Sequence, residues 1–99
     1  MKTPIEVQGH TSNIPFRRGR LTNWELSALR ALSVMDFLVK EGVKNRIFAY
    51  GFGSSRPIYP INTPSGRRKN QRVDIIILKP KAEKNIVKQV NYEGFEFSL

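Results

Sequence analysis

The sequence lacks cysteine entirely and has a single histidine among its 99 residues. The absence of cysteine excludes a disulfide scaffold, a zinc ribbon and a thiol nucleophile. One histidine cannot form a histidine metal cluster, so we expect no metal and no other cofactor. No apolar run reaches the roughly 18 residues that a membrane-spanning helix needs, so we expect no such helix in these residues.

Acidic residues are also scarce, because 8 Asp and Glu stand against 17 Lys and Arg and leave a net charge of +9. The excess is concentrated at 17–20 and 67–72, two stretches bounded by turn-forming residues. These cations either form solvated surface loops or border one anion-binding region. Such a charge makes nucleic acid the first partner to test. However, the aromatic row Phe48, Tyr50 and Phe52, which could stack on bases, is expected in the core.

Local patterns predict an α+β fold with one well-marked helix. Thr22 and Glu25 form a capping-box pattern before that helix, and Gly42 is a typical stop after it. Apolar and β-branched composition predicts the strands, the last of which should be central in the sheet. The expected elements are strands over 5–9, 46–52 and 73–78, helices over 23–41 and 82–90, and a helical turn over 65–69. We assign residues 1–80 to one domain and 81–99 to a C-terminal tail.

One arginine in the long helix does not fit its amphipathic pattern. Seven side chains form a broad apolar arc: Trp24, Ala28, Ala31, Leu32, Met35, Leu38 and Val39. Arg30 lies outside this arc among apolar neighbours, where an unpaired charge is costly. Its partner could be Glu6 or Asp74 or an anion from outside, or its stem could carry the charge to water. Periodicity alone does not choose among these.

The sequence offers no convincing catalytic constellation. Ser12 and His10 lie close together, but no acid is evident that would orient the imidazole of a hydrolytic triad. Gly51-Phe-Gly53 is not a phosphate-binding loop, because it lacks the Gly-Lys-Ser/Thr ending of that motif. The acids show no pairing suited to glycoside cleavage. We therefore expect a binding module with no catalytic residues rather than an enzyme.

Several longer motifs are characteristic of a known family. They occur in the family's order, across residues 5–79, and together the chain resembles the OmpA-like peptidoglycan-binding domain. The Asn-Trp-Glu-Leu-Ser string and the insertion with Ile14-Pro15 resemble its flagellar motor members in particular. The motifs are Gly9-His-Thr-Ser-Asn-Ile-Pro15, Asn23-Trp-Glu-Leu-Ser-Ala-Leu-Arg-Ala31, Gly51-Phe-Gly53 with Arg56-Pro57, Asn62-Thr-Pro-Ser-Gly-Arg67 and Asn70-Gln-Arg-Val73.

The resemblance implies an OmpA-like βαβ-type mixed sheet packed by helices, and noncovalent binding of the diamino acid in the cell-wall stem peptide. In the family the arginine at the position of Arg30 grips a carboxylate of that diamino acid, which favours the external anion among the alternatives above. The resemblance places further ligand-binding residues around it: Thr11, Ser12 and Asn13 in the preceding loop, Asn23 and Leu26 at the helix end, and Arg72 before the last family strand.

Two residues depart from the family pattern. Ser12 stands where the family has an aspartate that meets the ammonium of the ligand, and a serine supplies no charge for a charge-assisted bond. Affinity should then fall, or a different diamino acid should be preferred. Gln71 replaces the first arginine of Asn-Arg-Arg-Val, so some local charge pairing should be lost.

The resemblance also sets expectations about assembly and location. The family domain begins with a strand and a helix upstream of the position of Ile5, so we expect an N-terminally truncated domain. A sheet edge and an apolar face left open would favour self-association, and the motor members are dimers. We therefore expect a homodimer, together with stator and motor proteins as partners. It would be the periplasmic part of an inner-membrane protein, joined to the membrane only through a missing N-terminal helix.

The expected role is to anchor the flagellar motor stator to the cell wall. One alternative in the same binding class is an OmpA- or Pal-like envelope anchor without a motor role. Another, from a different class, is a basic nucleic-acid-binding module, whose affinity would fall steeply with salt. Because of the resemblance we expect no nucleic acid as a partner.

Overall fold

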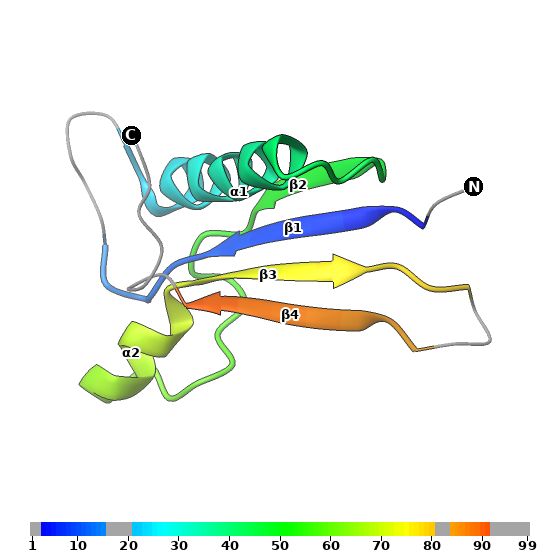
Figure 1. The fold of residues 1–99 in the computed structure, drawn as a ribbon. Coiled ribbons are helices and arrows are strands. Elements are labelled where there is room, and N and C mark those ends of the chain that lie inside the picture. Colours follow the sequence, from blue (N-terminus) through cyan, green and yellow to red (C-terminus); the bar gives the residue numbers. More distant parts are fainter. Residues whose placement is uncertain (1–2, 16–20, 81–83, 92–99) are drawn as a thin grey trace.

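The computed structural model describes residues 3–15, 21–80 and 84–91. One long helix lies against a four-stranded sheet, and a short helix lies beyond one end of it (Figure 1). The elements are β1 (Ile5–His10), α1 (Asn23–Lys40), β2 (Ile47–Gly51), α2 (Pro64–Asn70), β3 (Arg72–Ile77) and β4 (Ile86–Asn91). Neither described helix combines the length and hydropathy required to cross a bilayer.

The sheet is mixed, with strand order β2-β1-β3-β4. β1 pairs with β2 in parallel, and β3 pairs with both β1 and β4 in antiparallel. Parallel neighbours need a crossover connection, which here is α1. These pairings confirm the predicted α+β mixed sheet and the central position of β3.

The ends of α1 follow the predicted signals. The Thr22 hydroxyl accepts from the backbone N–H of Glu25 at 3.4 Å and donates to its carboxylate at 3.1 Å. The helix ends at Lys40, and Gly42 follows with a φ of 94°, which a glycine adopts without a steric penalty. Local sequence therefore determines the length of α1.

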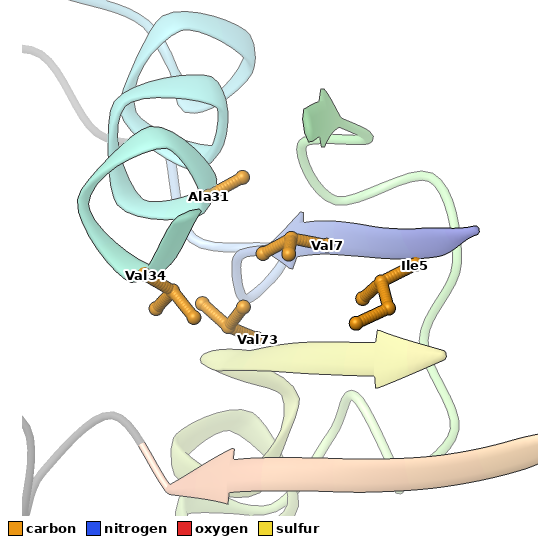
Figure 2. Packing of buried hydrophobic residues seen from close by; sticks show 5 residues of the cluster. All are labelled: Ile5, Val7, Ala31, Val34 and Val73. Atoms are coloured by element: carbon orange, nitrogen blue, oxygen red, sulfur yellow. The ribbon is translucent and has the colours of Figure 1, made fainter. Parts of the chain in front are cut away.

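The side of α1 that faces the sheet is not the predicted apolar arc. The core consists of Ile5, Val7, Ala31, Val34 and Val73 (Figure 2). Three arc residues, Trp24, Leu32 and Val39, are 58%, 43% and 57% exposed. The buried stripe instead includes Leu26, Ser27, Arg30, Ala31 and Val34, so the helix is turned by about 100°, one residue's rotation.

Two glycines explain this orientation. A Cβ at Gly9 would lie 1.9 Å from the Ser27 carbonyl oxygen, and one at Gly51 would lie 2.6 Å from the Ala28 nitrogen. The helix backbone thus rests directly on β1 and β2, which leaves no room for large side chains. Small Ser27 and Ala28 can face this contact, whereas Trp24 and Leu32 cannot.

The helix predicted over 82–90 is wrong, because residues 86–91 form β4. The spacing of Ile86, Val87 and Val90 is compatible with a helix, but a short apolar run is ambiguous in period. In the structure β3 offers its backbone N–H and C=O groups along the edge opposite β1, and β4 pairs with it from Arg72 to Ile77. Residues 81–83 lie outside the described residues, and the domain boundary at residue 80 stays a prediction.

Replacing Gly9 with alanine should destabilise the fold by about 3 kcal/mol, because the added methyl group must displace the backbone of α1. Urea unfolding would measure this. Gly42→Ala is the matched control: its positive φ strains an alanine by about 1 kcal/mol, but among the described residues beyond its chain neighbours no atom lies within 4 Å of the new methyl. If Gly9→Ala costs no more than this control, the close approach of α1 is refuted.

Candidate functional site

The candidate site lies where the end of β1 meets the first half of α1. The loop that follows β1 is attached to the helix at two points. Thr11 donates its backbone N–H to the Gly53 carbonyl at 2.8 Å, and the Gly53 N–H in turn donates to the Ser27 hydroxyl at 2.9 Å. Further along, the Asn23 side-chain amide donates to the Ile14 carbonyl at 3.1 Å. The loop and the helix therefore form one unit.

Two hydroxyl residues of this loop are buried, since Thr11 and Ser12 are each 3% exposed. The Thr11 hydroxyl donates to the Ser12 carbonyl at 3.1 Å, and the Ser12 hydroxyl accepts from the Ile14 N–H at 3.3 Å. A hydroxyl has two acceptor positions and one donor, so this bond uses only part of the capacity of Ser12. The next residue, Asn13, is exposed.

Arg30 extends from the buried stripe of α1, one turn after the buried Leu26, and is 6% exposed. Its Nη1 donates a hydrogen bond to the side-chain oxygen of Gln71, which directly precedes β3. His10 lies opposite Arg72 in the antiparallel register of β1 and β3. Thr11, which follows β1, and Gln71, which precedes β3, are therefore the next residues at this end of the two strands. The guanidinium of Arg30 is thereby held at the same end of the sheet as the loop.

Gln71 is the functional neighbour that sequence reasoning missed. From the sequence, Gln71 is expected only to remove the positive charge of a family arginine. In the structure its amide oxygen accepts a hydrogen bond from Arg30. The two carboxylates considered for Arg30 contact other groups: Glu6 accepts from Gln8 at 3.0 Å, and Asp74 pairs with Arg72. The antiparallel pairing of β1 with β3 brings Gln71 to this end of the sheet, and local sequence patterns do not show that pairing.

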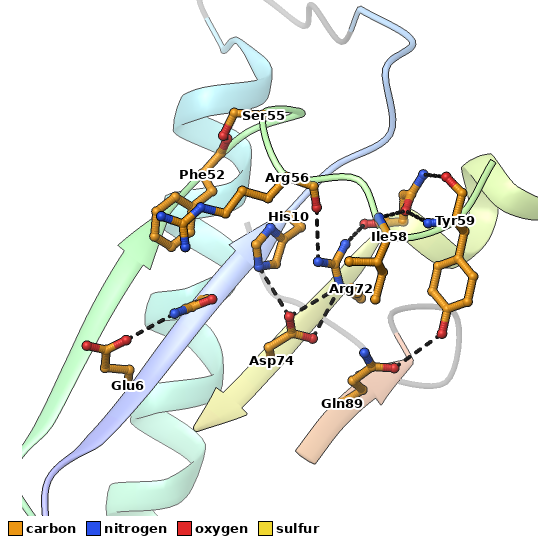
Figure 3. A network of polar contacts seen from close by, with 12 residues as sticks. Glu6, His10, Phe52, Ser55, Arg56, Ile58, Tyr59, Arg72, Asp74 and Gln89 are labelled. Carbon is orange, nitrogen blue, oxygen red and sulfur yellow. Dashed lines mark hydrogen bonds and ion pairs between the residues drawn. The ribbon is translucent and has the colours of Figure 1, made fainter. Parts of the chain in front are cut away.

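Arg72 lies in a different environment (Figure 3). Its Nε is 3.2 Å from Asp74 Oδ1, and its other nitrogens donate to the carbonyls of Asn70 at 3.3 Å and Arg56 at 3.1 Å. Val73 packs against α1, so its neighbour Arg72 points to the opposite face of the sheet. The structure does not bring the guanidiniums of Arg72 and Arg30 together, and ligand contact by Arg72 stays a prediction.

An acid does lie beside His10, contrary to expectation. Asp74 Oδ2 is 3.4 Å from His10 Nε2, and the imidazole stacks on Phe52 with ring centres 5.5 Å apart. Sequence could not show this contact because the two residues lie on different strands. The Ser12 oxygen accepts from Ile14, and in the described part of the chain no hydrogen bond joins it to His10. His10 and Asp74 thus belong to a buried polar network.

The aromatic row on β2 also differs from expectation. Phe48 and Tyr50 were expected in the core, but each is 42% exposed. They alternate with Ile47 and Ala49, which pack against the core on the α1 side of the sheet. Phe52 is half-buried between His10 and Arg56, whose guanidinium carbon is 3.8 Å from the ring centre.

Comparison with known proteins supports the flagellar motor resemblance. Residues 1–71 match the OmpA family. Motility protein B of Bacillus subtilis is 36% identical over 77 residues, which cover 75% of this chain and 30% of that protein. The peptidoglycan-binding protein ArfA of Mycobacterium tuberculosis is 40% identical over 74 residues, covering 74% of this chain and 22% of ArfA. This chain therefore spans less than a third of these relatives.

Solved structures agree with this result. The crystal structure of the C-terminal domain of Helicobacter pylori MotB superposes with a TM-score of 0.74 at 34% identity. The match covers 81% of this chain and 62% of that domain. Sequence and fold thus point to the same group of proteins.

Asp74→Asn should lower the free energy of unfolding by about 3 kcal/mol, because it leaves the buried guanidinium of Arg72 without a counter-charge. Thermal and urea unfolding would measure the loss. Asp36→Asn, the same change on the exposed side of α1, should stay within about 0.5 kcal/mol of the unmodified chain. Equal stability of the two variants would contradict a structural role for the Arg72–Asp74 pair.

Proposed function

Because the chain belongs to the OmpA family, we propose that it binds peptidoglycan without performing chemistry and anchors a flagellar motor stator to the cell wall. The ligand is the diamino acid of the stem peptide, and its carboxylate binds Arg30. No catalytic residue, metal or cofactor takes part. The single observation that carries this proposal is the buried position of Arg30, whose guanidinium donates to Gln71 at the end of the sheet from which the loop after β1 leaves.

The chemistry of arginine supports this assignment. Its planar fork suits a carboxylate, which it can hold through two parallel hydrogen bonds. Gln71 accepts from one nitrogen of the guanidinium and adds no formal charge, so it helps to fix the orientation of the fork. The net charge of +9 favours the approach of an anionic polymer.

The remaining site residues then have graded roles. Thr11 and Ser12 offer hydroxyl groups next to the ligand, while Asn13 and Asn23 border the entrance. Leu26 provides an apolar wall one helical turn from Arg30. The contacts of Arg72 with Asp74 and with two backbone carbonyls support a positioning role, because they attach β3 to the loop before α2.

The motor assignment follows from the relatives named motility protein B. It implies that this segment is the periplasmic part of an inner-membrane protein whose partners are the stator and motor proteins. An OmpA- or Pal-like envelope anchor would use the same site without the motor. The gene neighbourhood, or an N-terminal membrane helix in the full-length protein, would separate these two functions.

We further propose that the chain forms a homodimer through the outer edge of β2 and the adjoining side of α1. Among the described residues β2 pairs only with β1, so its other edge is open. Trp24, Leu32 and Val39 are exposed apolar side chains on the part of the α1 arc that lies outside the core. Trp24 lies against Gly53, just beyond the end of β2, so the arc and the strand edge adjoin. A second copy could extend the sheet and cover the arc.

Leu32→Glu should shift this equilibrium towards monomer by at least about tenfold, because dimerisation would bury its charge. Sedimentation equilibrium across a concentration series would measure the change. Ile61→Glu is the control, since Ile61 is similarly exposed but lies before α2. A chain that is monomeric throughout, or a Leu32→Glu variant that dimerises as well as the control, would refute this interface.

Arg30→Ala should abolish co-sedimentation with purified peptidoglycan, because it removes the carboxylate clamp. Arg30→Lys should weaken it by about tenfold, since the charge remains but the two-pronged grip is lost. Circular dichroism would verify that each variant is folded. Binding of either variant at the unmodified level would rule out the proposed site.

Arg46→Ala is the matched control, because Arg46 is exposed at the start of β2 and should not affect binding. Repeating the binding at rising salt tests the nucleic-acid alternative. A phosphate-binding surface would lose affinity steeply as counterions are released, whereas one arginine clamp responds weakly. Tight, strongly salt-dependent binding of single-stranded DNA with none to peptidoglycan would overturn the proposed function.

A further inference from the structure

The loop of residues 56–61, which leads to α2, exposes two isoleucines that the proposed function does not use. Ile58 is 54% exposed and Ile61 is 47% exposed. They lie three residues apart, in a segment whose backbone is further restricted by Pro57 and Pro60. One exposed apolar side chain is ordinary, but two on a short loop form an apolar tip that suits contact with another apolar phase.

Buried polar side chains hold this loop in place (Figure 3). The Asn70 side chain is fully buried, and its Oδ1 accepts the backbone N–H groups of Ile58 and Tyr59, each at 3.0 Å. Its amide nitrogen donates to the Tyr59 carbonyl at 3.0 Å, and Arg72 donates to the Arg56 carbonyl at 3.1 Å. The backbone on both sides of Ile58 is therefore fixed, and the fold itself presents the isoleucine to the outside.

Cationic side chains of α2 border the same loop. Arg67 Nη1 donates to the Ile61 carbonyl at 3.3 Å, and Lys69 Nζ lies 5.5 Å from the centre of the Tyr59 ring. A carbonyl oxygen and an aromatic ring carry no formal charge, so neither contact neutralises the cation. The surrounding sequence from 42 to 73 contains no Asp or Glu. The loop and α2 thus combine an apolar tip with a positively charged flank.

This combination fits an anionic lipid surface. Apolar side chains enter the boundary between headgroups and acyl chains, while Lys and Arg stay at the level of the negative headgroups. A protein partner would need an interface of roughly 800 Å² on each side with a central aromatic or arginine anchor, which two isoleucines on one loop do not supply. A single nucleic-acid strand would stack on exposed aromatic rings, whereas this tip is aliphatic.

We propose that the 56–61 loop and α2 form a peripheral membrane-docking surface. Ile58 and Ile61 enter the headgroup region of an anionic bilayer, and Arg67 and Lys69 bind its negatively charged headgroups. The contact is interfacial, so it needs no membrane-spanning helix. It uses none of the residues placed around Arg30 and does not depend on the proposed function.

The test is co-sedimentation of the 99-residue chain with vesicles of phosphatidylglycerol and phosphatidylcholine in equal parts, and with vesicles of phosphatidylcholine alone. Each cation near an anionic surface should strengthen binding by about fivefold, so the mixed vesicles should bind at least about tenfold more tightly. Equal binding to the two compositions would overturn the proposal. Failure to bind either would overturn it too and leave the loop as a surface for a protein partner.

Ile58→Glu should weaken binding to the mixed vesicles by at least about tenfold, because a carboxylate replaces the inserted side chain and faces negative headgroups. Val87→Glu is the matched control, since Val87 is 52% exposed on β4 and gains the same charge away from the loop. Urea unfolding would verify that both variants fold. If a folded Ile58→Glu variant binds as well as the control, the apolar tip does not insert and the proposal fails.

The cationic flank has its own matched pair. Changing Arg67 and Lys69 together to glutamine should weaken binding by at least about tenfold, because two headgroup contacts are lost. Changing Lys44 and Arg46 together to glutamine removes the same charge at exposed positions before β2, at the other end of the sheet, and should have a smaller effect. Equal losses in the two double variants would show that net charge alone attracts the chain, which contradicts a defined docking surface.

Discussion

The close contact between the backbone of α1 and the sheet is the constraint on which the rest of the structure depends. Gly9 and Gly51 let the helix lie directly on β1 and β2, where any side chain would collide with its backbone. At the same contact the Ser27 hydroxyl receives the Gly53 N–H, and the Gly53 carbonyl receives the Thr11 N–H. The packing of the core and the attachment of the binding loop therefore arise from one geometric condition.

This contact also explains how a charged residue can lie in the buried stripe of α1. If the helix faced the sheet with its apolar arc, Arg30 would point sideways into solvent. Turned about its axis, it brings Arg30 towards the end of the sheet, where Gln71 accepts its hydrogen bond. That bond offsets part of the cost of burying Arg30, and part of the apolar arc is left exposed in exchange. Exposed Trp24 and Leu32 are thus a consequence of placing Arg30 at the site.

Sequence reasoning succeeded where the determinants are local. The Thr22 cap, the Gly42 stop and the β-branched run of β3 each act within a few residues, and the structure confirms the elements they predict; it also confirms the helical turn expected over 65–69. It failed where a partner lies far along the chain. β4 depends on the open edge of β3, and the acid beside His10 comes from another strand. The predicted orientation of α1 is wrong for the same reason, because the hydrophobic pattern of a helix does not show that Gly9 and Gly51, on two strands, let its backbone approach the sheet.

The two departures from the family pattern affect the same end of the sheet. Ser12 and Gln71 lie far apart in sequence, yet the pairing of β1 with β3 brings their segments to the same end of the sheet, where Gln71 accepts from Arg30. Each is neutral where the family carries a charge, one negative and the other positive, so their net effect on the formal charge of the site is zero. What changes is where charge lies: the loop after β1 carries a neutral hydroxyl at Ser12, and Arg30 donates to the neutral amide of Gln71.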